Sequence, residues 1–290
     1  IKTDAGGQVL VQGSGGGITL GAGTMTQSGS ISINADSTVA LDGAIHGEGA
    51  VLAYGAGISI GAAGSVSSNA TGDAISLVSS TTFTNNYGGN PLSTPNGRWL
   101  VYAADPASVT KNGMTSAFRQ YSTVYGGAIG SSGIGINGFI YASAPGTLNV
   151  DTTLTGGTAS HTYGGPVTAT VGYVIAPASV AVADNEDLAA ITGTPTFTPD
   201  LASSNVGLYS VLYDTGLLSA AGYTFAAGAG LAYTVNAVML QAVAASLTGA
   251  TTKVYDGTNI ASLTSGNFLL TGWIGSDSAT VSKTTGIYDL

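Results

Sequence analysis

Side chains that could carry acid–base or metal chemistry are scarce in this chain. Its 290 residues include 15 Asp and Glu, 6 Lys and Arg, 2 His and no Cys. Without Cys there is neither a thiolate metal site nor a disulfide framework. His46 and His161 are far apart in the sequence, and each lies among small or polar residues typical of a turn or a surface. They do not indicate a zinc site or an imidazole-based catalytic triad.

The densest group of carboxylates is formed by Asp184, Glu186 and Asp187. Oxygen-rich loops bind Ca²⁺, and extracellular calcium is abundant enough for weak sites. These three residues are therefore the candidate metal ligands of the chain. The alternative is a solvated turn, which the sequence favours. A melting temperature that does not change when a chelator is added would rule out the calcium hypothesis. We expect no metal site and no cofactor elsewhere.

A second set of carboxylates lies near the N-terminus, at Asp36, Asp42 and Glu48. Some coiled β proteins cleave polysaccharides with such residues, and that chemistry needs two carboxylates at a fixed separation around a sugar. Few basic or aromatic residues accompany them here to line a sugar cleft. We therefore expect no enzyme, and a polysaccharide-degrading protein remains a minor alternative.

A glycine pattern at Gly133–Gly138 matches the dinucleotide fingerprint G-x-G-x-x-G. The fingerprint requires a strand before it and a helix after it, because the helix N-terminus binds the pyrophosphate. The residues that follow, 139–143, are typical of a strand instead. In a chain with 45 Gly the match is interpreted as chance, and no nucleotide is expected.

Aromatic residues gather between residues 80 and 146, together with both Arg residues of the chain. Exposed rings there could stack on sugars, and Trp99 and Tyr102 are the candidate glycan-binding residues. A packed cap explains the same cluster equally well, because Tyr at strand positions commonly packs in a core or pairs across strands.

The overall composition is that of uncharged β material. Charged residues make up 7% of the chain, against about 25% in ordinary soluble domains. A net charge of −9 excludes a nucleic-acid partner and disfavours an anionic membrane surface. No apolar run of about 20 residues is long enough to span a bilayer. These features favour a structural or adhesive extracellular protein, and we expect the chain to be an internal piece of a longer one.

A degenerate repeat of alternating apolar pairs organises residues 1–79. Alternation with period two places both members of a pair on one side of a strand, and Gly, Ser and Asn mark the corners between strands. Two interleaved sets recur about every 20 residues, as expected for the coils of a parallel β-helix of about four turns. The pairs are Ile18/Leu20, Val39/Leu41, Ile58/Ile60 and Ile75/Leu77, alternating with Val9/Val11, Ile31/Ile33 and Val51/Ala53.

The remaining chain divides into three predicted sections. Residues 80–146 break the repeat and read as an aromatic-rich β cap or junction, since the last coil of a stacked helix needs covering. Residues 147–237 contain short strands with frequent turns, which suits an immunoglobulin-like β-sandwich. Residues 238–290 begin a further, partial β repeat. The predicted fold class is all-β: a short right-handed parallel β-helix, a cap, a sandwich and the start of another repeat.

Several motifs resemble one family of large exported adhesins, the filamentous-haemagglutinin-like exoproteins of two-partner secretion. The junction resembles the segment that follows the long β-helix in that family. The next section resembles the mostly-bacterial immunoglobulin-like (MBG) domain, and the last resembles a repeat named for its Tyr-Asp-Gly (YDG) core. The residues that carry the resemblance are 96–102 and 104–106, then 161–165, 204–209 and 218–224, and finally 253–258.

The resemblance implies export through an outer-membrane transporter and display at the bacterial cell surface. It implies a rigid stalk or fibre that serves adhesion, biofilm cohesion or cell–cell contact. The expected partners are neighbouring copies of the chain, or the rest of a longer chain, joined through exposed β edges, together with surface glycans. A carbohydrate-binding surface module is the alternative function. The lack of Cys fits this route, because a disulfide formed in the periplasm would block passage of an unfolded chain.

Overall fold

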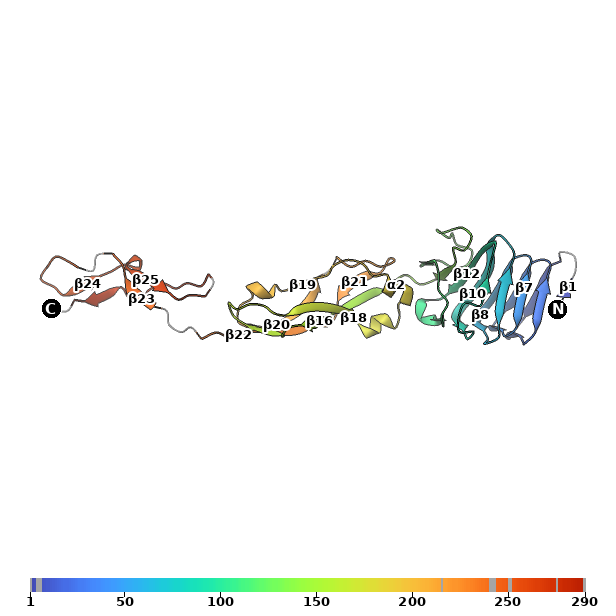
Figure 1. The fold of residues 1–290 in the computed structure, drawn as a ribbon, viewed down its shortest axis with the longest axis horizontal. Helices are drawn as coiled ribbons and strands as arrows, with labels where there is room; N and C mark the ends of the chain where they lie inside the picture. Colours follow the sequence, from blue (N-terminus) through green and yellow to red (C-terminus); the bar gives the residue numbers. More distant parts are fainter. Residues whose placement is uncertain are drawn as a thin grey trace. The chain divides into compact units, whose positions relative to one another are not determined.

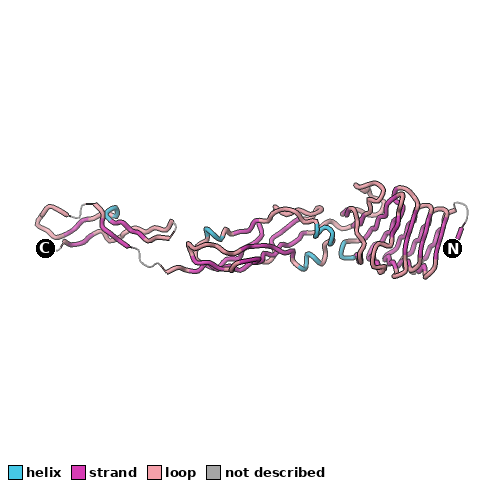
Figure 2. Tube along the Cα trace, viewed as in Figure 1, coloured by secondary structure: helices cyan, strands magenta, loops and turns pink. Residues whose placement is uncertain are grey.

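The protein is all-β, as predicted, with strands in 47% and helices in 7% of the chain (Figures 1 and 2). The computed structural model describes residues 2–3, 7–214, 216–239, 244–249, 252–274 and 276–288. Two compact units are present. The first contains residues 1–150, 175–196 and 214–228, and the second contains residues 151–174, 197–213 and 229–290. None of the described helices has the length and apolar character that a membrane crossing requires.

A parallel β-helix of about six turns forms most of the first unit (Figure 1). Its strands stack in two sheets. One sheet has the order β1 (Lys2–Thr3), β4 (Thr24–Gln27), β7 (Ala44–Gly47), β9 (Ser65–Ser68) and β11 (Leu92–Ser93). The main path of the other is β14 (Phe118–Gln120), β15 (Gly138–Tyr141), β12 (Gly97–Ala103), β10 (Gly72–Asn85), β8 (Val51–Ile60), β5 (Ile31–Ala35) and β2 (Val9–Gly13), with β3 (Ile18–Leu20), β6 (Thr38–Leu41) and β13 (Val109–Thr110) beside it.

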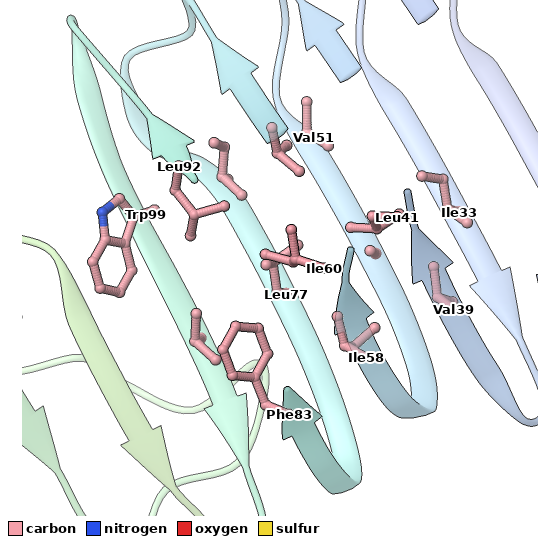
Figure 3. Close-up of a cluster of buried hydrophobic side chains, with 14 of the residues drawn as sticks. Ile33, Val39, Leu41, Val51, Ile58, Ile60, Leu77, Phe83, Leu92 and Trp99 are labelled. Carbon is pink, nitrogen blue, oxygen red and sulfur yellow. The ribbon is translucent and has the colours of Figure 1, made fainter. Parts of the chain in front are cut away.

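The apolar pairs of the repeat build the interior of the β-helix. Every strand pairing in it runs parallel, so equivalent residues of successive turns lie directly beside one another. Figure 3 shows these side chains gathered in the space that the strands enclose. Two of the inward rows are Val9, Ile31, Val51, Ile75 and Trp99, and Val11, Ile33, Ala53, Leu77, Val101 and Phe139.

The β-helix extends further than the sequence predicts, past residue 79 and through β12 and β15. The predicted end of the β-helix at residue 79 is therefore wrong, and the side chains of the later turns explain why. Trp99 and Phe139 take the inward positions that Ile and Leu hold in earlier turns, with their rings 5.5 Å apart in a T-shaped contact. The long connection at residues 104–137 separates β12 from β15 and hides the repeat in the sequence.

A small apolar cluster completes the first unit. Strand β21 (Thr224–Ala227) pairs in parallel with residues 147–150 of β16 (Thr147–Gly156). Two short helices, α1 (Pro177–Val180) and α2 (Asn185–Ala189), belong to the same unit. Their segment packs Ala183 and Leu188 against Leu148 and Tyr223. Segments that the sequence assigns to a separate section, 147–237, thus contribute to the unit of the β-helix.

Further sheets occur in the region predicted to be a sandwich, with mixed strand directions. Pairing is parallel between β17 (Ser160–Thr162) and β22 (Leu231–Asn236) and antiparallel between β20 (Gly207–Asp214) and β22, whereas immunoglobulin sandwiches use antiparallel sheets. The prediction of further β-sheets here is confirmed, and the pairing is less regular than expected. One sheet has the order β18 (Thr170–Ile175), β16 and β21. The other has the order β17, β22, β20 and β19 (Thr196–Thr198).

Two small antiparallel pairs lie in the last section of the chain. Strand β23 (Ala244–Leu247) pairs with β25 (Phe268–Thr271), and β24 (Ile260–Ser262) pairs with β26 (Thr285–Ile287). Many apolar side chains of this section are exposed, including Val254 and Tyr255. The section therefore holds little of the apolar core of its unit, most of which surrounds Val211 and Tyr233.

Candidate functional site

The acidic cluster lies on the helix α2, close to the aromatic end of the β-helix. Asp184 caps this helix, because its Oδ1 accepts a hydrogen bond from the N–H of Glu186 at 2.9 Å. The side chains of Asp184 and Asp187 are fully buried, and that of Glu186 is 21% exposed. The predicted solvated turn is therefore wrong, since two of the three carboxylates do not reach solvent.

Asp184 is held by a lysine and a tyrosine of the β-helix. The Nζ atom of Lys111 lies 2.9 Å from Oδ1 and 2.8 Å from Oδ2 of Asp184, and the hydroxyl of Tyr141 donates to Oδ2. The same Nζ lies 3.3 Å from Glu186 and 4.4 Å from the ring centroid of Phe139. One cation thus bridges two carboxylates while its other side faces an aromatic ring, which is a favourable setting for a partly buried ammonium group.

Asp187 is held by an arginine and a second tyrosine. The Nε atom of Arg119 donates to Oδ1 of Asp187 at 2.8 Å, and its Nη2 lies 2.7 Å from the same oxygen. The Tyr121 hydroxyl donates to Oδ2, and it lies 2.7 Å from the Tyr223 hydroxyl. Arg119 also reaches Glu186 at 3.2 Å. We call Lys111, Arg119, Asp184, Glu186 and Asp187 the ion-pair clamp.

The contacts of the clamp shift the pKa values of Asp184 and of the two tyrosines that bind the clamp. Burial alone would raise the pKa of Asp184, but hydrogen bonds from Lys111 and Tyr141 outweigh it and lower the pKa below its ordinary value. Burial, followed by the neighbouring carboxylates, raises the pKa of Tyr121 and of Tyr141 far above the usual range. Tyr121 and Tyr141 therefore remain neutral donors, and Asp184 remains an ionised acceptor.

These contacts bear on the calcium hypothesis for Asp184, Glu186 and Asp187. Ammonium, guanidinium and hydroxyl groups already occupy the oxygens that a cation would need. Over the ranges that the structure describes, no group of three His, Asp or Glu side chains is arranged to hold a metal ion. The geometry favours ion pairs as the use of this cluster. Sequence reasoning found the carboxylates and missed their partners, whose only signal was the rarity of cations in the chain.

The two predicted glycan residues lie on opposite faces of the same strand. Trp99 points into the β-helix and is 1% exposed, which leaves no ring face for a sugar, so its assignment is corrected. Its indole N–H is buried and finds no acceptor among the described residues. Tyr102 points away from the interior of the β-helix and, although it is 6% exposed, it lines a cleft of about 440 Å³. Only Tyr102 therefore remains as a candidate for ligand contact.

The N-terminal carboxylates lie at corners of the β-helix, whereas His46 lies on strand β7 and not in the predicted turn. His46 Nδ1 is 2.8 Å from the Ser67 hydroxyl, and its Nε2 is 3.1 Å from Glu48 Oε1. Glu48 also accepts a hydrogen bond from Asn69 at 2.8 Å, and contacts to Asn69 and then His46 lower its pKa. Asp36 accepts a hydrogen bond from a backbone N–H of the preceding turn. These polar groups link neighbouring turns, and Asp42 lies beside a glycine of the next turn, Gly61.

His161 belongs to the second unit and is buried, contrary to the predicted surface position. Its Nδ1 lies 3.1 Å from the Tyr233 hydroxyl. The tyrosine ring forms part of the apolar core of that unit. His161 is thus a packed core residue with one hydrogen-bond partner.

The glycine pattern at 133–138 forms a turn that leads into a strand, as predicted. Gly133 and Gly135 adopt φ values of 130° and 72°, and β15 follows directly. The side chain of Asn137 accepts a hydrogen bond from the backbone N–H of Trp99 at 2.9 Å. The segment therefore fastens one turn of the β-helix to the next, and no helix follows it to bind a pyrophosphate.

The Tyr-Asp-Gly motif of the last section forms a locked turn. Lys253 Nζ donates to Asp256 Oδ1 at 2.8 Å, to Thr258 Oγ1 at 3.0 Å and to the Ile260 carbonyl at 2.8 Å. These hydrogen bonds, from Lys253 first and then from Thr258, lower the pKa of Asp256 well below its ordinary range. Gly257 supplies a φ of 83°, which a residue with a side chain rarely adopts. The turn thus explains the Asp and the Gly of the motif, while Tyr255 is exposed.

Comparison with known proteins supports the last section. The YDG domain family model matches residues 239–290. Neither a curated protein nor a solved structure matches the chain closely enough to show a relationship. The YDG match and the β-helix together fit a β-rich repeat protein.

Proposed function

We propose that this chain is a structural or adhesive segment of a bacterial cell-surface exoprotein of the filamentous-haemagglutinin-like, two-partner-secretion type. The YDG match at 239–290 supports the proposal, as does the β-helix that precedes it. The motif resembling the junction lies in the last turns of the β-helix, and the motifs resembling the MBG domain follow it before the YDG section, in the order found in that family.

The observation that carries the proposal is the unbroken parallel pairing of the β-helix. Residues of β2, β5, β8, β10, β12 and β15 form one ladder in which each turn pairs with the next. A ladder of this kind resists shear because many backbone hydrogen bonds must break together. The ion-pair clamp then fixes residues 184–187 to the aromatic end of the ladder. These are the properties that a load-bearing surface segment needs.

We further propose that the role is non-catalytic and extracellular. Export through an outer-membrane transporter accounts for a chain of 290 residues without Cys. Neighbouring copies, or other parts of a longer chain, would pair through β edges. The carboxylates that could have served hydrolysis, Asp36 and Glu48, instead link turns of the β-helix.

The test uses the full-length protein in its native host. A strain lacking residues 1–290 is compared with the parent by protease shaving of intact cells and by attachment under flow. We expect the parent protein to be shaved and the deletion strain to attach less strongly. Protection of the protein in intact cells, or attachment unchanged by the deletion, would contradict the proposal.

A further inference from the structure

We propose that the outer face of the β-helix carries a binding groove for a neutral oligosaccharide, formed by Tyr54, Tyr102 and Tyr125. The inference deepens the adhesive role proposed above and rests on it. It assigns the adhesive contact to one face of the first unit and to one chemical class of ligand.

The floor of the groove is a row of outward-facing side chains. Parallel pairing places Tyr54 beside Val78, Val78 beside Tyr102, and Tyr102 beside Ile140. Because side chains alternate along a strand, this row lies on the opposite face from the buried rows of the core. Tyr54 is 45% exposed although it stands in an otherwise well-covered sheet. Val78, Tyr102 and Ile140 are themselves buried in a second apolar cluster, so Tyr54 is the exposed ring that this row offers to a ligand.

A braced loop forms the wall of the groove. The Gln120 side chain donates to the Thr123 hydroxyl at 2.9 Å and to the Ala128 carbonyl at 2.8 Å, and it accepts from the Gly130 N–H at 2.9 Å. Ser122 has a φ of 54°, a left-handed conformation that costs free energy in a residue with a side chain. Such strain is found where the surrounding structure holds a segment in place for use.

The braced loop presents apolar groups to solvent. Val124 is 63% exposed and Tyr125 is 45% exposed, although the hydrogen bonds of Gln120 fix the loop around them. The Tyr125 ring meets the Tyr102 ring edge to face, with centroids 5.3 Å apart. A fixed and exposed aromatic ring loses little conformational entropy when it binds a ligand.

Two adjoining clefts share Tyr102 and Tyr125. Their volumes are about 440 Å³ and about 390 Å³, both within the range of small-ligand sites. The first is lined by rings and small side chains, including Tyr54. The second adds Asp73 and Ser76 and the backbone of Gly126 and Gly127. The groove therefore joins an apolar part to a polar part.

A groove that combines an apolar part with a polar part fits a sugar chain. A sugar ring offers an apolar face for stacking on tyrosine and hydroxyl groups for hydrogen bonds to a carboxylate or serine. Asp73 is oriented for such bonds, because the Arg98 Nε donates to its Oδ1 at 2.5 Å. Its negative charge and the net charge of −9 disfavour acidic sugars. An added peptide strand would need a sheet edge, whereas the groove lies on a sheet face whose backbone groups are already paired.

The test is a glycan array followed by titration calorimetry. The purified 290-residue protein is applied to an array of neutral hexose, N-acetylhexosamine and sialylated oligosaccharides, and the strongest neutral oligosaccharide is titrated. Tyr54→Ala and Tyr125→Ala should each weaken binding at least about tenfold, as loss of an aromatic anchor does. Tyr87→Ala is the matched control, because Tyr87 is 47% exposed and lies outside both clefts. It should bind like the parent.

Three results would overturn the groove: no binding to any neutral oligosaccharide, binding confined to sialylated ones, or binding unchanged in both tyrosine variants. Thermal melting separates lost binding from lost folding, since both rings are half exposed and their removal should leave the melting temperature near that of the parent. Cells that still attach under flow while the protein binds no glycan would reject the groove and keep the proposed adhesive function.

Discussion

Replacing Asp187 by Asn tests whether the ion-pair clamp stabilises the first unit. The Asp187 side chain is fully buried, forms an ion pair with Arg119 and accepts hydrogen bonds from Arg119 Nε and from the Tyr121 hydroxyl. Asn has nearly the same shape and keeps one carbonyl acceptor, so packing is preserved while the negative charge is lost. The variant leaves a guanidinium that is 15% exposed with Glu186 as its remaining acidic partner.

The expected cost follows from what the substitution leaves unpaired. Removing one partner of a buried ion pair typically costs roughly 3–5 kcal/mol, mostly because the other charge stays buried without compensation. Glu186 still lies 3.2 Å from Arg119 and offsets part of that loss. We therefore expect about 3 kcal/mol, the lower end of the range. For a unit of this size each kcal/mol lowers the melting temperature by about 2–4 °C, so the shift is about 6–12 °C.

The assay exploits the two Trp residues of the chain. In a Trp273→Phe background, the remaining Trp99 lies in the core of the β-helix and reports unfolding of the first unit by fluorescence in urea. Glu48→Gln is the matched control, because it removes a carboxylate that is 52% exposed at a corner of the same β-helix. A loss below about 0.5 kcal/mol for Asp187→Asn, the size of an ordinary surface change, would refute the reasoning.

Three further predictions concern the same unit. Gly43→Ala should cost about 1–3 kcal/mol in urea unfolding, because a Cβ there would lie 2.5 Å from two backbone carbonyls, while Gly21→Ala, with open space around it, should be neutral. Asp184 has a lowered pKa, so its stabilisation is complete above its ordinary value of 3.8 and is lost as the pH falls further; Asp184→Asn should flatten the acid limb of the stability curve. Burial, and then the charge of Asp73, raises the pKa of Tyr102 from 10.0 to about 12, so the stability that its neutral form contributes should be lost as the pH rises between these values. Ultraviolet titration of the parent should show tyrosine ionisation at about pH 12, and the titration of Tyr102→Phe should lack that ionisation step.

The early turns of the β-helix were predictable because their information is local. Ile31 and Ile33 share a face by alternation, and the same pattern returns about one turn later at Val51 and Ala53. Parallel stacking of like residues then follows from the repeat alone. The YDG turn was recognisable for the same reason, since the groups that close it lie within a few residues of Asp256.

The ion-pair clamp was not predictable from one sequence. Lys111 and Asp184 are 73 residues apart, and Arg119 and Asp187 are 68 apart. No local pattern links a cation to a carboxylate over such a distance, so burial of the aspartates could not be read from their neighbours. The predicted glycan role of Trp99 was wrong for a related reason. A Trp side chain is common both in sugar-binding surfaces and in apolar cores, and the register of β12 against β10 decides which face of the sheet Trp99 occupies.

Most of the few basic residues of the chain form ion pairs within the structure. Of the six Lys and Arg in the chain, Arg98, Lys111, Arg119 and Lys253 all pair with carboxylates. Arg98 pairs with its neighbour in the ladder and Lys253 closes a local turn, whereas Lys111 and Arg119 join α2 to the end of the β-helix. Backbone pairing is indifferent to sequence and can extend in either direction, whereas a buried ion pair accepts one partner geometry. The ladder therefore supplies strength, and the buried ion pairs of Lys111 and Arg119 supply specificity.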